Sequence, residues 1–314
     1  MPIIRVTDEF NLSLPVPFVN VDVAKDNRLF LDPSAIRVAG RNGDRYAQRA
    51  HQQLVDFFTE IITCARSSKP ADQRRGLSML QRLHEPNETR LGYSINGSRG
   101  HAFADEMGER LWETIRTNRT LMSGTGPTLN VQTAVLSRLE HLPLFIDRID
   151  RDMISDMATR IVFDVLRDFT FDMIAAYPSI GASMATDTYP IWDAVSGDLV
   201  EKSLDLPVAQ GKPLLLVPTN WIFWRTVMDP DQFYNRYATR TIQDEQTTYA
   251  SDGKASKPSK ELIKKNNKAV KETNVRQATK YADQHDRNLV LEYEQEIDAN
   301  HEPMTLDEID RKLQ

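Results

Sequence analysis

The chain has 314 residues, of which 40% are hydrophobic and 27% charged, which is typical of a globular protein with a substantial core. The formal net charge of −6 argues against a protein that coats nucleic acid through its overall charge, so any such contact must be local. The single cysteine, Cys64, excludes an intrachain disulfide and a zinc site made from several cysteines of one chain.

The first half of the chain is predicted to be mainly helical. Two prolines interrupt residues 12–23, which we interpret as an edge strand or extended arm, and residues 28–36 as a short strand or buried loop ending in a turn at Asp32-Pro33. Residues 45–65 carry apolar side chains at three- and four-residue intervals, which indicates an amphipathic helix. Further helices are predicted over residues 72–83, 102–122 and 131–139.

Residues 152–177 form the most regular pattern and are predicted to be one long helix that ends at Pro178. Short β-rich runs follow in residues 190–195, 199–200 and 212–218, with residues 196–198 between the first two, beside an aromatic group that contains Trp221 and Trp224. We therefore expect an α+β fold, with a predominantly helical body and a small antiparallel sheet near residues 190–225. No run of 18 apolar residues and no signal-peptide pattern occurs, so we expect a cytoplasmic protein without a membrane segment.

After residue 250 the chain becomes polar and its charges separate. Residues 253–280 hold nine Lys/Arg against two Glu, or +7, and residues 281–314 hold three Lys/Arg against ten Asp/Glu, or −7. The sequence therefore predicts a mainly helical globular domain over residues 1–250 and a charge-segregated helical tail over residues 251–314. The two blocks could pair with each other, fold back on the body or dock a partner.

The first candidate site is a glycine-containing segment, residues 85–101, that leads into a predicted helix. A phosphate-bearing ligand could be held there by backbone amides and by polar side chains. We assign ligand binding to Arg90, Gly92, Tyr93, Ser94 and Arg99, and catalytic roles to Glu88 and His101. The spacing matches neither a P-loop nor a dinucleotide fingerprint, and an ordinary structured loop is the alternative interpretation.

The second candidate site is a series of aspartates that begins before the long predicted helix. Asp152 and Asp156 lie one helical turn apart on one face, which suits a shared divalent cation, and we assign them catalytic and metal-binding roles. Asp164, Asp168 and Asp172 repeat this spacing. Arginines at 148, 151, 160 and 167 are interleaved with the series, so a salt-bridged surface is the alternative interpretation.

Three short segments of the sequence resemble a poorly characterised group of bacterial proteins found among antiphage-defence and mobile-element genes. They occupy residues 26–33, 91–94 and 152–157, and residues 214–218 form a fourth. The resemblance implies a bacterial defence role and names no reaction.

We therefore expect a sensor or interaction component of an antiphage-defence system. A protein partner from the same system is expected, and nucleic acid and self-association are further options. The alternative hypothesis is a metal-dependent nuclease or phosphodiesterase that uses the Asp152/Asp156 pair, the glycine segment and Mg or Mn. It requires the two candidate sites to be neighbours in space.

Overall fold

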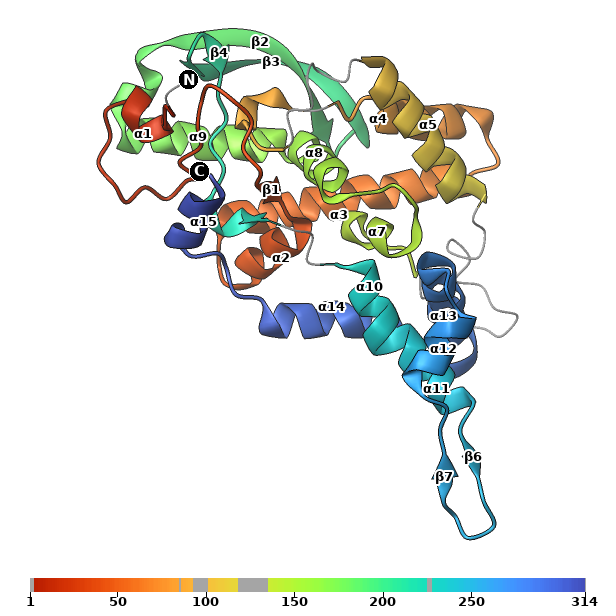
Figure 1. The fold of residues 1–314 in the computed structure, drawn as a ribbon. Helices are drawn as coiled ribbons and strands as arrows, with labels where there is room; N and C mark the ends of the chain where they lie inside the picture. The colour runs from red at the N-terminus through yellow and green to blue at the C-terminus, as the bar shows by residue number, and fades with distance from the viewer. Residues whose placement is uncertain (1–2, 85, 93–100, 118–134, 225–227, 314) are drawn as a thin grey trace. The chain divides into compact units, whose positions relative to one another are not determined.

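The computed structural model describes residues 3–84, 86–92, 101–117, 135–224 and 228–313 (Figure 1). The chain forms two compact units. Unit 1 comprises residues 1–113, 150–227 and 301–314, and unit 2 comprises residues 114–149 and 228–300. The fold is α+β and dominated by helices, as predicted. None of the helices in the described residues is long and apolar enough to cross a membrane.

Helix α3 (Arg45–Arg66) is the longest helix of unit 1 and confirms the prediction for residues 45–65. It begins after Asp44, whose carboxylate accepts hydrogen bonds from the amides of Tyr46 and Ala47 at 2.9 and 3.0 Å. A side-chain cap of this kind stabilises a helix by about 1 kcal/mol. Its apolar side is buried against the rest of the unit, with Leu54, Phe57 and Ile61 at most 2% exposed.

Residues 28–36 contain a helix that the sequence interpretation missed. Strand β1 (Phe30–Leu31) is followed at once by helix α2 (Pro33–Arg41). Asp32 accepts a hydrogen bond from the amide of Ser34 at 2.7 Å, and Pro33 occupies the first helical position. Proline is favoured there because its missing N–H has no helical partner in any case. The turn predicted at Asp32-Pro33 was therefore wrong.

The single helix predicted over residues 152–177 is two helices, α8 (Arg151–Ile161) and α9 (Phe163–Ala176). The break lies at Val162, which has φ −96° and ψ 18° and is fully buried. Both helices pack against the same strand, β2. Each helix thus buries its own apolar side, and no glycine or proline marks the bend.

The main sheet of unit 1 is a long antiparallel hairpin, β2 (Met184–Asp193) and β3 (Asp198–Ala209), extended by the short β4 (Lys212–Pro213). Figure 1 shows the hairpin curving over α8 and α9. The small antiparallel sheet near residues 190–225 is thus confirmed, although its first strand begins six residues before the predicted start. A second pairing joins β1 to β5 (Ile222–Phe223) beside the buried Trp221.

Helices α4 (Pro70–Gln81) and α5 (His101–Thr117) correspond to two other predicted helices, except that residues 118–122 lie outside the described residues. Of the helix predicted over residues 131–139, residues 131–134 also lie outside them. Within the described part, only the short turn Leu139–His141 is helical. Residues 12–23 form an extended arm rather than a strand, with an isolated bridge from Phe18 to Pro218.

Unit 2 is helical and contains most of the predicted tail. It includes α7 (Leu142–Phe145), α10 (Pro230–Phe233), a π-helical turn (Tyr234–Ala238), α11 (Thr239–Glu245), a small hairpin of β6 (Thr248–Tyr249) and β7 (Ala255–Ser256), α12 (Lys260–Asn266), α13 (Val270–His285) and α14 (Leu289–Asn300). Ala278, Leu289 and Val290 are 1% exposed, so α13 and α14 belong to the core of the unit. Helix α15 (Leu306–Lys312) belongs to unit 1. The division predicted at residue 250 does not coincide with these units.

The oppositely charged blocks of the C-terminal region find partners elsewhere in unit 2. From the basic block, Lys257 pairs with Asp244 at 3.0 Å and Lys280 with Glu245 at 2.7 Å. From the acidic block, Glu294 is 1% exposed and lies 3.0 Å from Arg138. The sequence left open whether the two blocks pair with each other, fold back on the body or dock a partner. In these three ion pairs, the charged blocks contact residues of the body.

Cys64 lies on the buried side of α3, and we expect its thiol to be inert in the native protein. The side chain is inaccessible, and a Cβ added to Gly76 of α4 would lie only 2.7 Å from its Cβ. Burial raises the pKa of the Cys64 thiol to about 11, so the nucleophilic thiolate is scarce near neutral pH. An aromatic disulfide reagent at pH 8 should label the protein only after denaturation. Stoichiometric labelling of the native protein within minutes would contradict this prediction.

Candidate functional site

Two distant segments of unit 1 are joined by the side chain and backbone of Asn27. The Asn27 amide nitrogens, main chain and side chain, both donate to the Arg90 carbonyl at 2.8 Å. In return, the amide of Gly92 donates to the carbonyls of Asn27 and Leu29 at 2.9 and 3.2 Å. Asn27 is 3% exposed, so these hydrogen bonds are shielded from water. The beginning of the glycine segment is therefore fixed against residues 27–29.

The start of α8 lies against the same place. Ser155 accepts a hydrogen bond from the amide of Leu31 at 3.0 Å, which attaches α8 to β1. Gly92 has φ +111°, and a Cβ added there would lie 2.9 Å from Oδ1 of Asp152. The Leu215 amide donates to the Glu88 carbonyl at 2.8 Å. The described parts of the four resembling segments, residues 26–33, 91–92, 152–157 and 214–218, thus lie next to one another in one region.

Replacing Gly92 by alanine is expected to disturb both the backbone and Asp152. A side chain at this φ is strained by about 1–3 kcal/mol, and its Cβ would displace the Asp152 carboxylate. Gly43 offers a matched control, because it has φ +97° but no atom within 4 Å of an added Cβ. Gly92→Ala should therefore lower the free energy of unfolding more than Gly43→Ala in urea titrations. Equal effects of the two variants would contradict the prediction.

Asp152 and Asp156 are half-buried on one face of α8, as the sequence predicts for residues one turn apart. The helix begins after Asp150, which accepts a hydrogen bond from the Met153 amide at 3.0 Å. This cap fixes the first turn, on which Asp152 lies. No cluster of three or more potential metal ligands occurs within the described ranges of the chain. A cation here would be held by two carboxylates together with water or a ligand.

Arg90 occupies a structural position at the edge of this region. It is 5% exposed, and its guanidinium donates to the carbonyls of Val23 at 3.2 Å, Pro213 at 3.1 Å and Asn87. Burial lowers the pKa of Arg90. These contacts cross-link the extended arm, the turn at Asn87–Thr89 in the first part of the glycine segment, and β4. They direct one N–H group of each guanidinium nitrogen to a backbone carbonyl.

A buried charged group lies further along α8. Arg160 is two turns beyond Asp152, is 5% exposed, and approaches Glu88 at 4.0 Å and the ring centroid of Phe163 at 4.9 Å. Burial lowers the pKa of Arg160 and raises that of Tyr189 to about 12. Glu88 Oε2, Arg160 Nη1 and the Tyr189 hydroxyl have no hydrogen-bond partner within the part of the chain that the structure describes. The sequence interpretation placed Glu88 in the site but missed Arg160 and Tyr189.

The remaining predicted site residues lie in or next to the gap at residues 93–100. Tyr93, Ser94 and Arg99 are outside the described residues. His101 begins α5, but only its backbone is described. Of the predicted ligand-binding and catalytic residues, the structure therefore brings together Gly92, Asp152 and Asp156, with Glu88 and Arg90 anchored nearby.

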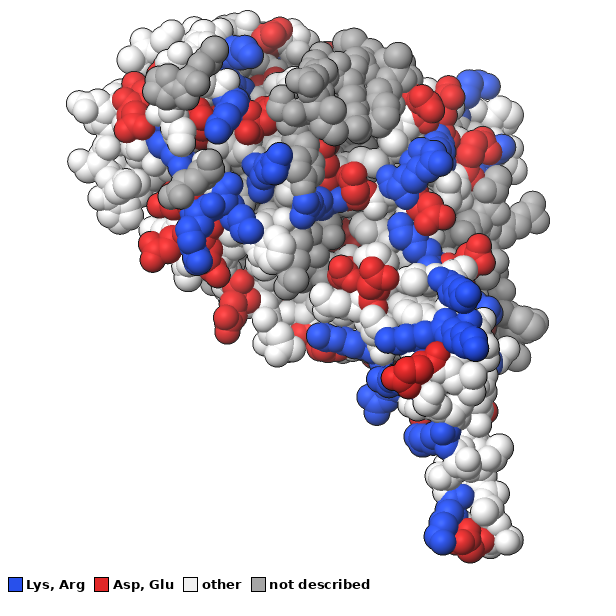
Figure 2. Space-filling model, viewed as in Figure 1, with Lys and Arg blue, Asp and Glu red and all other residues white. Residues whose placement is uncertain are grey.

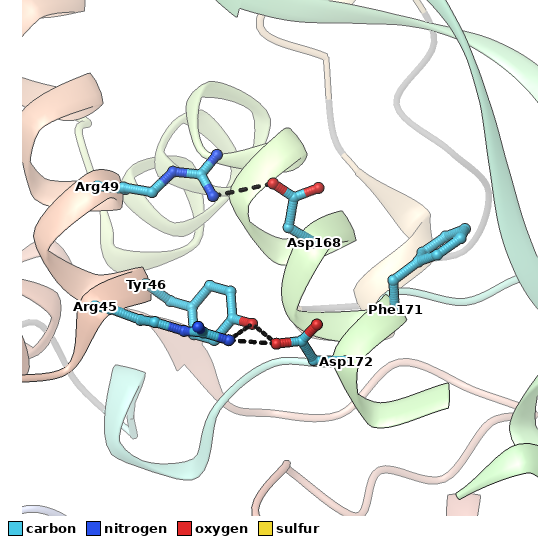
Figure 3. A pocket seen from close by; sticks show the side chains of 6 residues that line it. All are labelled: Arg45, Tyr46, Arg49, Asp168, Phe171 and Asp172. Atoms are coloured by element: carbon cyan, nitrogen blue, oxygen red, sulfur yellow. Dashed lines mark hydrogen bonds and ion pairs between the residues drawn. The ribbon is translucent and has the colours of Figure 1, made fainter. Parts of the chain in front are cut away.

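The second half of the aspartate series forms an ion-pair ladder with α3 (Figure 3). Arg49 pairs with Asp168 at 3.0 Å, and Arg45 and Tyr46 both donate to Asp172. With Phe171, which points away from Arg45 and Arg49, these side chains line a surface cavity of about 350 Å³. Asp168 and Asp172 therefore belong to a salt-bridged surface, which was the alternative interpretation of the aspartate series. Most of their partners come from α3. Exposed pairs of this type contribute about 0–1 kcal/mol each.

These features define a helix-dominated α+β protein with a polar region where the glycine segment meets the start of α8. Residues 14–229 match the family described as "Domain of unknown function (DUF8370)", and the chain belongs to this family. No curated protein and no solved structure matches the chain significantly. The family description names no activity, so the functional argument rests on the residues themselves.

Proposed function

We propose that this protein is a metal-dependent phosphodiesterase that cleaves nucleic acid, with Asp152 and Asp156 holding Mg²⁺ or Mn²⁺. The observation that carries the proposal is the close approach of Gly92 to Asp152, because it makes the glycine segment a neighbour of the acidic pair. Glycine at this position leaves the carboxylate room and allows the backbone to approach a ligand closely. The antiphage-defence setting and the cytoplasmic location are part of the proposal.

Two carboxylates are a suitable donor set for magnesium. Mg²⁺ keeps several of its water molecules and is commonly bound by one or two carboxylates together with substrate phosphate oxygens. Mg²⁺ or Mn²⁺ held by Asp152 and Asp156 would supply Lewis-acid activation of a water molecule for hydrolysis of a phosphodiester. Arg160 provides positive charge further along the same helix, and burial strengthens its electrostatic influence. His101 and Glu88 stay candidates for proton transfer.

The experiment that tests this function is incubation of the purified protein with supercoiled, linear and single-stranded DNA and with RNA. Each substrate is combined with Mg²⁺, Mn²⁺ or EDTA, and the products are separated on gels. Cleavage that requires a divalent cation supports the proposal. The absence of cleavage in every lane, with protein whose folding is verified by circular dichroism, would refute it.

A sensor or interaction component of an antiphage-defence system is the second candidate. It is favoured by the β6–β7 hairpin of unit 2, whose strands are exposed and whose Tyr249 is 72% exposed. A partner protein of the same system, or a second copy of the chain, would bind this hairpin. Protection of a bacterial host against phage that persists in Asp152→Asn/Asp156→Asn but is lost with Tyr249→Ala would favour this candidate over the phosphodiesterase.

A further inference from the structure

A short stretch of unit 2 exposes a dense group of lysines. Within residues 254–268 the only acidic residue is Glu261. Six lysines are exposed there: Lys254, Lys257, Lys260, Lys264, Lys265 and Lys268. Figure 2 shows basic side chains over the part of unit 2 that carries α12 and along the β6–β7 hairpin. We call residues 254–268 the lysine segment. Its charge contrasts with the net charge of −6 of the whole chain.

Most of this charge is left uncompensated by the protein. Lys254 and Lys257 pair with Asp252 and Asp244 at 3.2 and 3.0 Å. The four lysines of α12 and its C-terminal flank make no ion pair within the described residues: Lys260, Lys264, Lys265 and Lys268. Like charges on neighbouring turns repel one another, so this arrangement lowers stability unless an anion binds.

The fold holds α12, the helical part of the lysine segment, in place at both ends. Gln243 of α11 donates to the Pro258 carbonyl at 2.8 Å, and Ser259 caps α12 through the Leu262 amide at 3.2 Å. At the other end, the Tyr234 hydroxyl donates to the Asn267 carbonyl at 2.7 Å. Between them, Ile263 is 1% exposed and anchors α12 to the unit. The lysines therefore project from a fixed backbone, which reduces the entropic cost of binding.

Two exposed side chains, those of Tyr249 and Leu262, indicate whether the lysines suit a membrane surface or a nucleic acid. Tyr249 of β6 is 72% exposed, and its Cα partner in the hairpin is Ala255, the residue after Lys254. Leu262 is 51% exposed and is the only large exposed hydrophobic side chain within the lysine segment. A membrane-binding helix requires a continuous apolar face, and one leucine does not provide it. An exposed aromatic ring in the hairpin that leads into a run of lysines instead suits the bases and phosphates of a single strand.

We propose that the lysine segment and Tyr249 bind single-stranded nucleic acid, with the lysines on phosphates and the tyrosine ring stacked on a base. The Asp152 region contributes no residue to this surface, so binding here and cleavage there are separate properties. The proposal shares only its ligand class with the phosphodiesterase function.

The test is fluorescence anisotropy with labelled single-stranded DNA and RNA oligonucleotides in EDTA, so that cleavage does not contribute. Lys260, Lys264, Lys265 and Lys268 are all changed to glutamine, which removes charge and keeps length. The matched control changes four exposed basic residues of unit 1 to glutamine: Lys69, Arg74, Lys202 and Lys212. Circular dichroism and thermal unfolding verify that both variants fold.

We expect the lysine variant to bind at least about tenfold more weakly than the control variant. The slope of log affinity against log salt concentration should fall by about 3, because each phosphate contact on a single strand contributes roughly 0.7. Tyr249→Ala should weaken binding by about fivefold or more without changing that slope. Equal affinity of the lysine and control variants would overturn the proposal. So would binding to phosphatidylserine vesicles, lost in the lysine variant, without any binding to oligonucleotides.

Discussion

Changing both Asp152 and Asp156 to asparagine is expected to abolish metal-dependent cleavage while leaving the fold intact. The amides preserve side-chain volume but remove the two negative charges that bind the cation. A bound ion contributes several kcal/mol to stabilisation of the transition state, so the rate should fall by at least about 10²-fold. The two carboxylates are half-buried on α8, which limits the effect on packing. Initial rates on the preferred substrate, measured at saturating Mg²⁺ and Mn²⁺, check this prediction.

The matched control changes two exposed aspartates of the β2–β3 hairpin, Asp187 and Asp205, to asparagine. This variant loses the same formal charge and should cleave at the wild-type rate. Calorimetric titration with Mn²⁺ provides a second measurement, in which only the Asp152→Asn/Asp156→Asn protein should lose binding. Undiminished cleavage by that protein would remove these aspartates from the proposed chemistry.

The sequence predicts the elements whose signal is local and repetitive. The apolar spacing of residues 45–65 identifies α3 because Leu54, Phe57, Phe58 and Ile61 are buried on one side. The break at Val162 was missed, since the apolar pattern continues on both sides of it and its cause is packing on β2. The start of α2 had a local signal, because Asp32-Pro33 is a helix cap followed by proline at the first position. We interpreted this dipeptide as a turn, so this error came from the interpretation.

The sequence indicated which residue types make up the candidate site, but it did not indicate most of the contacts between them. The glycine and the aspartate pair were identified from spacing, but their proximity depends on hydrogen bonds that join distant parts of the chain. Asn27 donates one of them to the Arg90 carbonyl, and Ser155 accepts another from the Leu31 amide. The structural role of Arg90 could not be predicted from the sequence. Its acceptors are backbone carbonyls, which every residue has, so no residue type indicates them. The partners of Asp168 and Asp172 on α3 are more than 100 residues away, and no local pattern indicates them.

Arg90→Ala is expected to cause the largest loss of stability among the changes considered near the site. Hydrogen bonds from a charged donor contribute about 1.5–3 kcal/mol each, and removal of the guanidinium leaves the carbonyls of Val23, Asn87 and Pro213 without this donor in a buried place. We expect the free energy of unfolding of unit 1 to fall by roughly 3 kcal/mol or more. Urea titration followed by tryptophan fluorescence measures the change, because Trp112, Trp192 and Trp221 are buried in this unit.

Arg90→Lys separates the hydrogen bonds of Arg90 from its charge, and Arg74→Ala is the control at an exposed arginine. Arg90→Lys keeps a positive charge but has one nitrogen in place of the planar fork, so it should recover only a small part of the loss. Alanine and arginine experience similar strain at φ 57°, so backbone strain does not explain the effect of Arg90→Ala. Exposed Arg74→Ala should change stability by less than about 0.5 kcal/mol. If Arg90→Ala unfolded at the same urea concentration as Arg74→Ala, the guanidinium would not be the cross-link that joins the extended arm, the turn at Asn87 and β4.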